Sequence, residues 1–364
     1  MEVDLAAIRH NVRVIRRRLG PGVRFMAVVK ANGYGHGAVE VARTALEVGA
    51  SYLGVATVDE AVELRKAGLD APILVLGPVL PEGAEAAVKW DVTATVFSDG
   101  QVDALARECL RQRKKGKVHV KVDTGMGRIG LRHPQEVISL CSRVLSGPLE
   151  LEGVYTHFAC AEEETKHKAS WQLKAFQEVL AIMEQAGIKV GIRHAANSAA
   201  ALEFPESHLD MVRVGIAMYG YHPRPGTRGL DLRPALTWKA RVVQVKRLPH
   251  GTPIGYGWSY TTRGEEIIAT VCVGYADGYR RGLSDKGWVL VRGKKAPVVG
   301  RVCMDQLMVR LDQEVEPGEE VVLLGCQSNE CISADNIGDW LDTISYEVLT
   351  SIGERVPRVY AAAY

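Results

Sequence analysis

The sequence predicts an α/β protein with an N-terminal (β/α)8 barrel, a TIM barrel, followed by a mostly β C-terminal domain. Three observations lead to this prediction. Short apolar segments typical of buried strands alternate eight times with helix-like segments over about 230 residues. After Arg233 the pattern changes to short alternating strands separated by Gly and Pro turns. Finally, 364 residues with 47% hydrophobic content are enough for two cores.

The barrel elements follow one another in a regular order. Residues 5–19 carry apolar residues at helical spacing, so a helix comes first. We expect strands at residues 24–30, 51–56, 72–77, 92–97, 117–123, 151–157, 191–195 and 209–214. We expect helices near residues 38–48, 58–67, 82–89, 99–114, 134–146, 167–187 and 196–202. Asp59 and Ser98 with Asp99 fit as N-caps, and Gly49 and Gly68 fit as helix stops.

The alternative to a barrel is a doubly wound open sheet, which usually has fewer strands and a single switch point. We place the barrel domain at residues 1–231 and the β domain at residues 232–364. The segment 221–233, rich in Pro, Gly and Arg, is interpreted as the linker. In the second domain a helical pattern returns only at residues 333–340.

Composition excludes several classes of function. A net charge of +2 gives no electrostatic attraction toward nucleic acid or anionic membranes. The seven cysteines show no paired spacing, so we expect neither a disulfide nor a zinc framework, and a reducing compartment. The first residues do not resemble a signal peptide, and no apolar run is long enough to span a membrane. Together these features predict a soluble cytoplasmic protein.

Polar residues lie just after the predicted barrel strands. The carboxyl ends of barrel strands form one face, where function gathers, so these residues would converge on one mouth. They are Lys30, Asn32, Tyr34, Arg128, His157, Asn197, Ser198, Arg213, Gly215 and Ile216.

Lys30 follows the buried run FMAVV, where burial would make its ammonium more acidic and the amine available as a nucleophile or base. The alternative is an ordinary lysine at a strand end that extends to solvent. Asn197 and Ser198 open a short helix and Gly215 follows the eighth strand, where this fold usually binds phosphate. His157 has no partner carboxylate at metal spacing, so we expect no metal. A lysine beside a phosphate cradle points to pyridoxal 5′-phosphate (PLP) held as a Schiff base.

Motifs along nearly the whole chain resemble those of bacterial alanine racemases. They are AVVKANGYGHG, DTGMGRIG, THFA, ANSAA, MVRVGIAMYG, IGYGWSY, VGYADGY, VGRVCMDQ and TISYEV. The resemblance implies a PLP-dependent enzyme that interconverts L-alanine and D-alanine, and supplies D-alanine for peptidoglycan. It also implies a head-to-tail homodimer with shared active sites.

The resemblance also assigns roles to individual residues. Lys30 would bind PLP, with Arg213 at the pyridine nitrogen, Arg128 at the phenolic oxygen and His157 near the ring. The residues implied at the phosphate are Tyr34, Ser198, Gly215, Ile216 and Tyr346. Tyr256 matches a second catalytic base, and Cys303, Met304 and Asp305 match a loop that contributes to the neighbouring subunit's site. Lys121 matches a position that is carbamylated in some members and then orients Arg128.

The chemistry of racemisation agrees with two bases. A proton must leave Cα on one face and return on the other, and one base reaches only one face. Lys30 and Tyr256 would serve the two faces, provided a nearby cation lowers the pKa of the tyrosine from about 10. An arginine at position 213 can only donate a hydrogen bond, which would keep the ring nitrogen neutral and suppress side reactions.

Each of these roles has a plainer alternative. Arg213 could pair with Asp210 on the surface, Tyr256 could pack an interface, and Lys121 could be an ordinary strand lysine. For the whole chain, the alternatives are a broader amino-acid racemase, a decarboxylase of the same fold, or a PLP-binding homeostasis protein on a lone barrel. The last should lack both a β domain and Tyr256.

Overall fold

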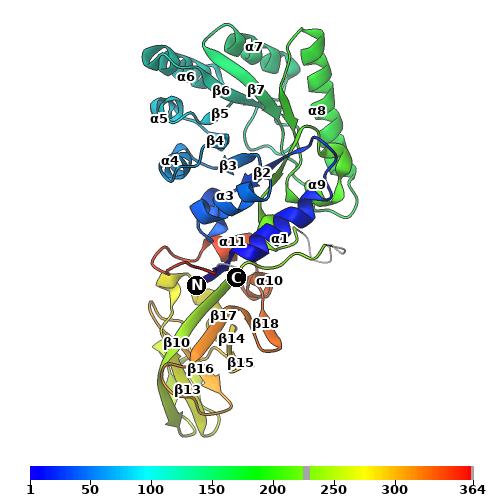
Figure 1. The fold of residues 1–364 in the computed structure, drawn as a ribbon. Coiled ribbons are helices and arrows are strands. Elements are labelled where there is room, and N and C mark those ends of the chain that lie inside the picture. Colours follow the sequence, from blue (N-terminus) through cyan, green and yellow to red (C-terminus); the bar gives the residue numbers. More distant parts are fainter. Residues whose placement is uncertain (224–229, 362–364) are drawn as a thin grey trace. The chain divides into compact units, whose positions relative to one another are not determined.

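The computed structural model describes residues 1–223 and 230–361. The chain forms two compact units (Figure 1). The barrel unit is Ala7–Arg233. The second unit combines Met1–Ala6 with Pro234–Tyr364. Part of the predicted linker, residues 224–229, lies outside the described residues.

The barrel unit contains the eight parallel strands that the sequence predicts, in the order β8-β7-β6-β5-β4-β3-β2-β9. Backbone hydrogen bonds of 3.0 Å from Asp210 N to Arg193 O and from Arg213 N to Ala196 O join the region of β8 to β9. This confirms the barrel and excludes the open sheet. The strands are β2 (Arg24–Val28), β3 (Tyr52–Val55), β4 (Ile73–Pro78), β5 (Thr93–Val96), β6 (Gly116–Lys121), β7 (Leu149–Tyr155), β8 (Ile192–His194) and β9 (Met211–Val214).

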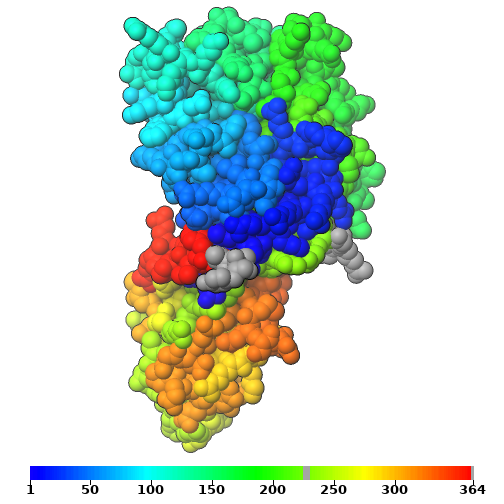
Figure 2. All heavy atoms as spheres, viewed as in Figure 1, coloured from blue at the N-terminus to red at the C-terminus, as the bar shows by residue number. Residues whose placement is uncertain are grey.

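Helices lie outside this ring of strands, as Figure 1 shows. They are α1 (Leu5–Arg16), α3 (Ala38–Glu47), α4 (Val58–Lys66), α5 (Ala84–Lys89), α6 (Asp99–Gln112), α7 (Pro134–Leu145), α8 (His167–Gln185) and α9 (Ser198–Glu203). In the space-filling view the blue-to-green residues of this unit form one continuous body (Figure 2). Strands β3, β5 and β9 are buried along their whole length, as expected for parallel strands covered by helices.

Helix ends follow local chemistry, with one correction. The N-cap of α4 is Thr57 rather than Asp59: its hydroxyl accepts from Glu60 N at 3.3 Å in a capping box. Ser98 occupies the N-cap position of α6 as expected, but its side chain accepts no capping hydrogen bond from the helix. Gly49 and Gly68 follow α3 and α4 with φ of +103° and +80°, a conformation that other residues adopt only under strain.

The second unit is mostly β, as predicted. Its main sheet has the order β15-β14-β17-β10-β1-β19; β13 joins β10, β16 joins β13, and β18 joins β17. The strands are β1 (Glu2–Asp4), β10 (Leu236–Leu248), β11 (Pro253–Ile254), β12 (Tyr260–Thr261), β13 (Glu266–Val271), β14 (Trp288–Val291), β15 (Lys294–Pro297), β16 (Leu307–Leu311), β17 (Glu320–Gln327), β18 (Glu330–Ile332) and β19 (Val359–Ala361).

The first residues of the chain differ from the expected domain assignment. Strand β1 pairs with β10 in antiparallel and with β19 in parallel orientation. These pairings place Met1–Ala6 in the second unit rather than with the barrel. The sequence offered no signal for this, because three residues are too few to show a strand period.

Two further expectations about the second unit were wrong. Helix α10 (Ala334–Leu341) agrees with the predicted helix, but a further helix, α11 (Ser345–Thr350), was missed because a six-residue helix shows little periodicity. Cys326 and Cys331 form a disulfide across the β17–β18 hairpin, where they are register partners. Their separation of five residues matches no short cysteine motif, so the sequence prediction of no disulfide failed.

Candidate active site

Lys30 lies in an unusual turn at the carboxyl end of β2. The strand ends at Val28, so Lys30 is not the last strand residue as predicted but the first residue of α2 (Lys30–Tyr34). Ala31, Asn32 and Tyr34 have φ of +51°, +50° and +51°, in the left-handed region. Several non-glycine residues in this region carry backbone strain, which proteins keep mainly at functional sites.

Two side chains hold this turn in place. Glu60, at the start of α4, accepts hydrogen bonds from Ala31 N at 2.7 Å and from Ala56 N at 2.6 Å. Asn32 accepts from Ala38 N at 2.9 Å and so joins the turn to α3. Asn32 is therefore a structural residue of the turn, and Glu60 is a supporting residue that the sequence analysis missed.

The surroundings of Lys30 favour a neutral amine. Burial lowers the pKa of Lys30 below its usual value, and the positive charge of Arg128 lowers it further, while Glu60 opposes both. A neutral amine has the lone pair that a nucleophile or base requires. The direction of this shift is the one that the sequence predicted, and the role of Lys30 as nucleophile or base stays a prediction.

Three of the predicted phosphate-binding residues meet beside the ends of β8 and β9. Ser198 Oγ accepts a hydrogen bond from Gly215 N at 2.9 Å. A Cβ at position 215 would collide with the Tyr34 hydroxyl, so only glycine allows this close approach. Burial raises the pKa of Tyr34 to about 12, which keeps its hydroxyl protonated as a donor. Asn197 does not join the group directly: it caps α9 by accepting from Ala200 N at 3.1 Å.

A second tyrosine, Tyr219, packs against this group of residues. The ring of Tyr219 stacks on Tyr34 with centroids 4.8 Å apart, and its hydroxyl donates to Val28 O at 3.0 Å. Ile216, at the start of the short 3₁₀ helix Ile216–Tyr219, is buried. Ring stacking therefore joins Tyr219 to Tyr34, beside the hydrogen bond between Ser198 and Gly215.

Arg213 points into the barrel and makes four hydrogen bonds. Its guanidinium contacts His194 Nδ1 at 2.9 Å, His157 Nδ1 at 3.1 Å, Thr156 O at 2.9 Å and Ala195 O at 2.9 Å. The surface alternative is wrong, because Asp210 pairs instead with Arg193 at 2.7 Å. Burial lowers the pKa of Arg213 to about 10, so the group remains a cation at neutral pH.

The positive charge of Arg213 affects the ionisation of two further side chains, His157 and Lys121. Burial and then the charge of Arg213 lower the pKa of both side chains well below their usual values. Lys121 is only 3% exposed, and its Nζ lies 4.5 Å from the centre of the Tyr155 ring. Arg128 is exposed in the loop after β6, where Asp123 accepts from Gly125 N and Gly127 N at 3.1 Å and 3.0 Å.

The remaining predicted site residues belong to the second unit. Tyr256 opens the 3₁₀ helix Tyr256–Trp258 and is 69% exposed; Met304 is 54% exposed. Gly257 packs against the guanidinium of Arg301, which places this turn next to the loop that carries Met304. Asp305 pairs with Arg355 at 2.7 Å. Cys303 lies in the same loop, and Tyr346 lies in α11.

Residues inside the barrel that sequence reasoning missed connect to Arg213. They are Glu152, His119, His194 and Tyr155. A signal was present, because polar residues alternate with valines in KVHVKVD, although a fully buried strand would be apolar throughout.

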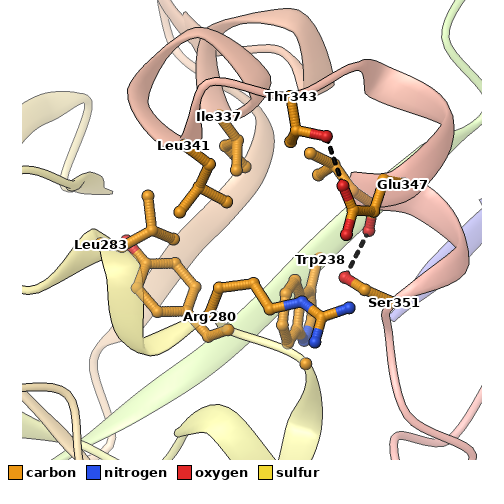
Figure 3. Close-up of a pocket in the computed structure, with 11 residues that line it drawn as sticks. Trp238, Arg280, Leu283, Ile337, Leu341, Thr343, Glu347 and Ser351 are labelled. Carbon is orange, nitrogen blue, oxygen red and sulfur yellow. Dashed lines mark hydrogen bonds between the residues drawn. The ribbon is translucent and has the colours of Figure 1, made fainter.

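A cavity in the second unit is not part of this site. It has a volume of about 240 Å³ and lies between Trp238, Leu283 and Leu341, with Arg280 and Glu347 at its polar side (Figure 3). None of the predicted site residues lines it. Within residues 1–223 and 230–361, no group of three or more His, Cys, Asp or Glu side chains is arranged to hold a metal ion.

Comparison with known proteins decides the family. The model of the alanine racemase N-terminal domain matches residues 3–223, and that of the C-terminal domain matches residues 235–360. The chain belongs to the alanine racemase family. It is therefore an isomerase of the racemase class.

Individual relatives support this over the full length. The alanine racemase of Desulforamulus reducens is 50% identical over 365 residues, covering 99% of this chain and 98% of the relative. That of Symbiobacterium thermophilum is 51% identical over 363 residues, covering 99% and 96%. The crystal structure of the alanine racemase from Bacillus anthracis, with bound L-Ala-P, matches with a TM-score of 0.96 at 44% identity. It covers 99% of this chain and 94% of that chain.

Proposed function

We propose that this chain is a PLP-dependent alanine racemase that interconverts L-alanine and D-alanine with two bases, Lys30 and Tyr256 of a second subunit. Family membership over both units supports alanine as the substrate and racemisation as the reaction. The observation that carries the proposal is the half-buried Lys30, with a lowered pKa, in a strained turn at the barrel mouth.

The residues at the mouth suit PLP. Ser198, Gly215 and Tyr34 would hold the phosphate, since glycine leaves the close approach that a side chain would fill. Ile216 and Tyr346 complete the proposed phosphate set. Arg213 would face the ring nitrogen as a donor, with His157 beside it, and Arg128 would face the phenolic oxygen. When bound, PLP withdraws electrons from the amino acid and makes its Cα proton acidic.

The protein's own part is to move that proton between two faces. Lys30 takes or returns the proton on one side of Cα, and Tyr256 does so on the other. Arg213 is a cation at neutral pH and cannot accept a proton, so it donates to the ring nitrogen without protonating it. Met304 and Asp305 would help to enclose alanine from the side of Tyr256.

We propose a head-to-tail homodimer because the second unit presents apolar groups to the outside. Tyr256, Trp258 and Met304 are exposed, although their size favours burial. A second subunit covering this patch would exclude water from Tyr256 and complete each site.

Lys121 is proposed to carry a carbamate that orients Arg128. Carbamylation requires a neutral, protected amine, and burial lowers the pKa of Lys121 well below its usual value. Enzyme prepared with ¹³C-labelled CO2 should show a carbamate carbon signal that is missing in Lys121→Met. A wild-type spectrum without this signal contradicts the modification.

We place the enzyme in the cytoplasm, where it would supply D-alanine for peptidoglycan. Among helices in the described parts of the chain, none has the length and apolar composition to cross a bilayer.

A racemisation assay with several L-amino acids and added PLP tests the proposal. We expect absorbance from the imine of PLP with Lys30, together with loss of optical rotation from L-alanine. A PLP-binding homeostasis protein would show the absorbance alone, and a decarboxylase would release CO2. A broader racemase would also act on other amino acids.

A further inference from the structure

A continuous hydrogen-bonded chain crosses the interior of the barrel behind Arg213. His194 Nδ1 lies 2.9 Å from Arg213 Nη1, and His194 Nε2 lies 2.8 Å from His119 Nδ1. His119 Nε2 then lies 3.0 Å from Glu152 Oε2. Both histidines are fully buried, so none of these contacts is replaced by solvent. Four different strands, β9, β8, β6 and β7, supply one residue each.

The position of every proton in this chain follows from its two ends. Arginine only donates, so His194 Nδ1 must accept, and the single proton of neutral His194 is then on Nε2. This Nε2–H donates to His119 Nδ1, which places the proton of His119 on Nε2, pointing at Glu152. The carboxylate only accepts. All donors therefore point from Arg213 toward Glu152.

The ionisation of the groups agrees with this order. Burial lowers the pKa of both histidines, so each carries one proton at neutral pH. Burial alone would raise the pKa of Glu152, but hydrogen bonds from His119 and Tyr52 outweigh it and bring the pKa to about 2. Lys117 adds an ion pair with the same carboxylate at 3.2 Å.

The surrounding packing fits the chain. A Cβ at Gly153 would collide with the ring of His119, so the glycine of LEGVY makes room for that ring. Tyr155 stacks on His194 with centroids 4.6 Å apart and 6° between the planes. Barrel interiors are usually filled by branched apolar side chains, so a row of hydrogen-bonded polar side chains in this position indicates a functional role.

We propose that Glu152, His119 and His194 are positioning residues that fix the tautomer of His194 and thereby the orientation of Arg213. Without the carboxylate, His119 can place its proton on Nδ1. His194 would then accept at Nε2 and turn an N–H toward the N–H of Arg213, which would displace the guanidinium. The link from the orientation of Arg213 to the reaction rests on the proposed function. The tautomers of His119 and His194 do not depend on it.

The test is ¹⁵N–¹H correlation NMR of the histidine rings in the full-length enzyme, with and without PLP. In wild type we expect neutral His119 and His194, both protonated at Nε2. In Glu152→Gln, which removes the charge but keeps the shape, the Nδ1–H form of His194 should become populated. Glu150→Gln, an exposed carboxylate on the same strand, should leave the wild-type pattern.

Kinetics and coupling provide the second readout. Glu152→Gln should lower kcat by about tenfold with little change in KM for alanine, as for other supporting residues behind a site. It should add no further loss in a His194→Phe background, because the two residues act as one unit. A wild-type His194 protonated at Nδ1 or at both nitrogens overturns the proposal even if no variant folds. An unchanged His194 tautomer in Glu152→Gln also overturns it. Absence of racemisation in wild type with the expected tautomers would count against the proposed function alone.

Discussion

The two units of the chain differ in how fully they enclose their candidate site residues. In the barrel unit, Arg213 is buried with four hydrogen bonds, and Lys30 lies in a turn held by Glu60 and Asn32. In the second unit, Tyr256 is 69% exposed on a short turn. The candidate residues of the barrel unit are held by hydrogen bonds, whereas Tyr256 is exposed.

This difference shows what each group of residues requires from its surroundings. Groups that must keep one geometry are enclosed by the barrel, where burial also shifts their pKa values. A base on an exposed turn is surrounded by water and becomes part of a dry site only when another surface covers it. Under the proposed function, that surface is the barrel mouth of a second copy.

The largest effect is expected from Lys30→Ala. Removing the amine removes both the imine with PLP and one base, so racemisation should fall by at least about 10³-fold. The imine absorbance should also disappear, as measured by spectral titration with PLP. Normal turnover in this variant would contradict the assignment of Lys30.

Tyr256→Phe should act on catalysis far more than on the cofactor. Loss of the hydroxyl removes the second base, so turnover should fall by about 10²–10⁴-fold while PLP titration stays close to wild type. Parallel measurement of racemisation and PLP affinity separates the two roles. Equal losses in both would mean that Tyr256 supports the fold of the site rather than proton transfer.

Gly215→Ala tests the barrel unit at the phosphate end. The new Cβ would displace the Tyr34 hydroxyl, so the affinity for PLP should fall by about tenfold. Gly100→Ala is the matched control, because a Cβ there meets no atom within 4 Å. Equal PLP affinity of the two variants, measured by titration, would remove Gly215 from the cradle.

The smallest expected effect concerns stability in acid. Glu152 has a folded-state pKa of about 2 against 4.5, so its contribution is fully present above pH 4.5 and is lost as the pH falls toward 2. In Glu152→Gln, the free energy of unfolding should therefore decline less between pH 5 and about 3, by roughly 1–2 kcal/mol once the partial exposure of this carboxylate is allowed for. Chemical denaturation at both pH values measures this, with Glu150→Gln as the control. A decline equal to that of wild type would show that the carboxylate gains nothing on folding.

Much of the fold was predictable, because its signals are local. Eight apolar strands separated by amphipathic helices are a pattern that few other folds share, and all eight strands were found. The end of the first barrel strand was not predictable, because a left-handed turn of Ala31, Asn32 and Tyr34 contradicts local preferences and is imposed by long-range contacts such as Glu60. Strand β1 and the Cys326–Cys331 disulfide likewise depend on the tertiary structure.

The candidate site was predictable where residues follow strands. Lys30, Ser198 and Gly215 stand at the ends of strands that the pattern identifies. The supporting residues Glu152, His119 and His194 lie within strands, and sequence alone does not show that their side chains meet inside the barrel. Their geometry required the structure.

Subunit mixing tests the central claim, that Lys30 of one subunit and Tyr256 of another form one site. Neither Lys30→Ala nor Tyr256→Phe should be active alone, but a mixed dimer would contain one intact site of two. After equal mixing and exchange, racemisation should return to about a quarter of the wild-type rate, because about half of the dimers are mixed. No recovery, with exchange confirmed by mass spectrometry, would contradict a shared site.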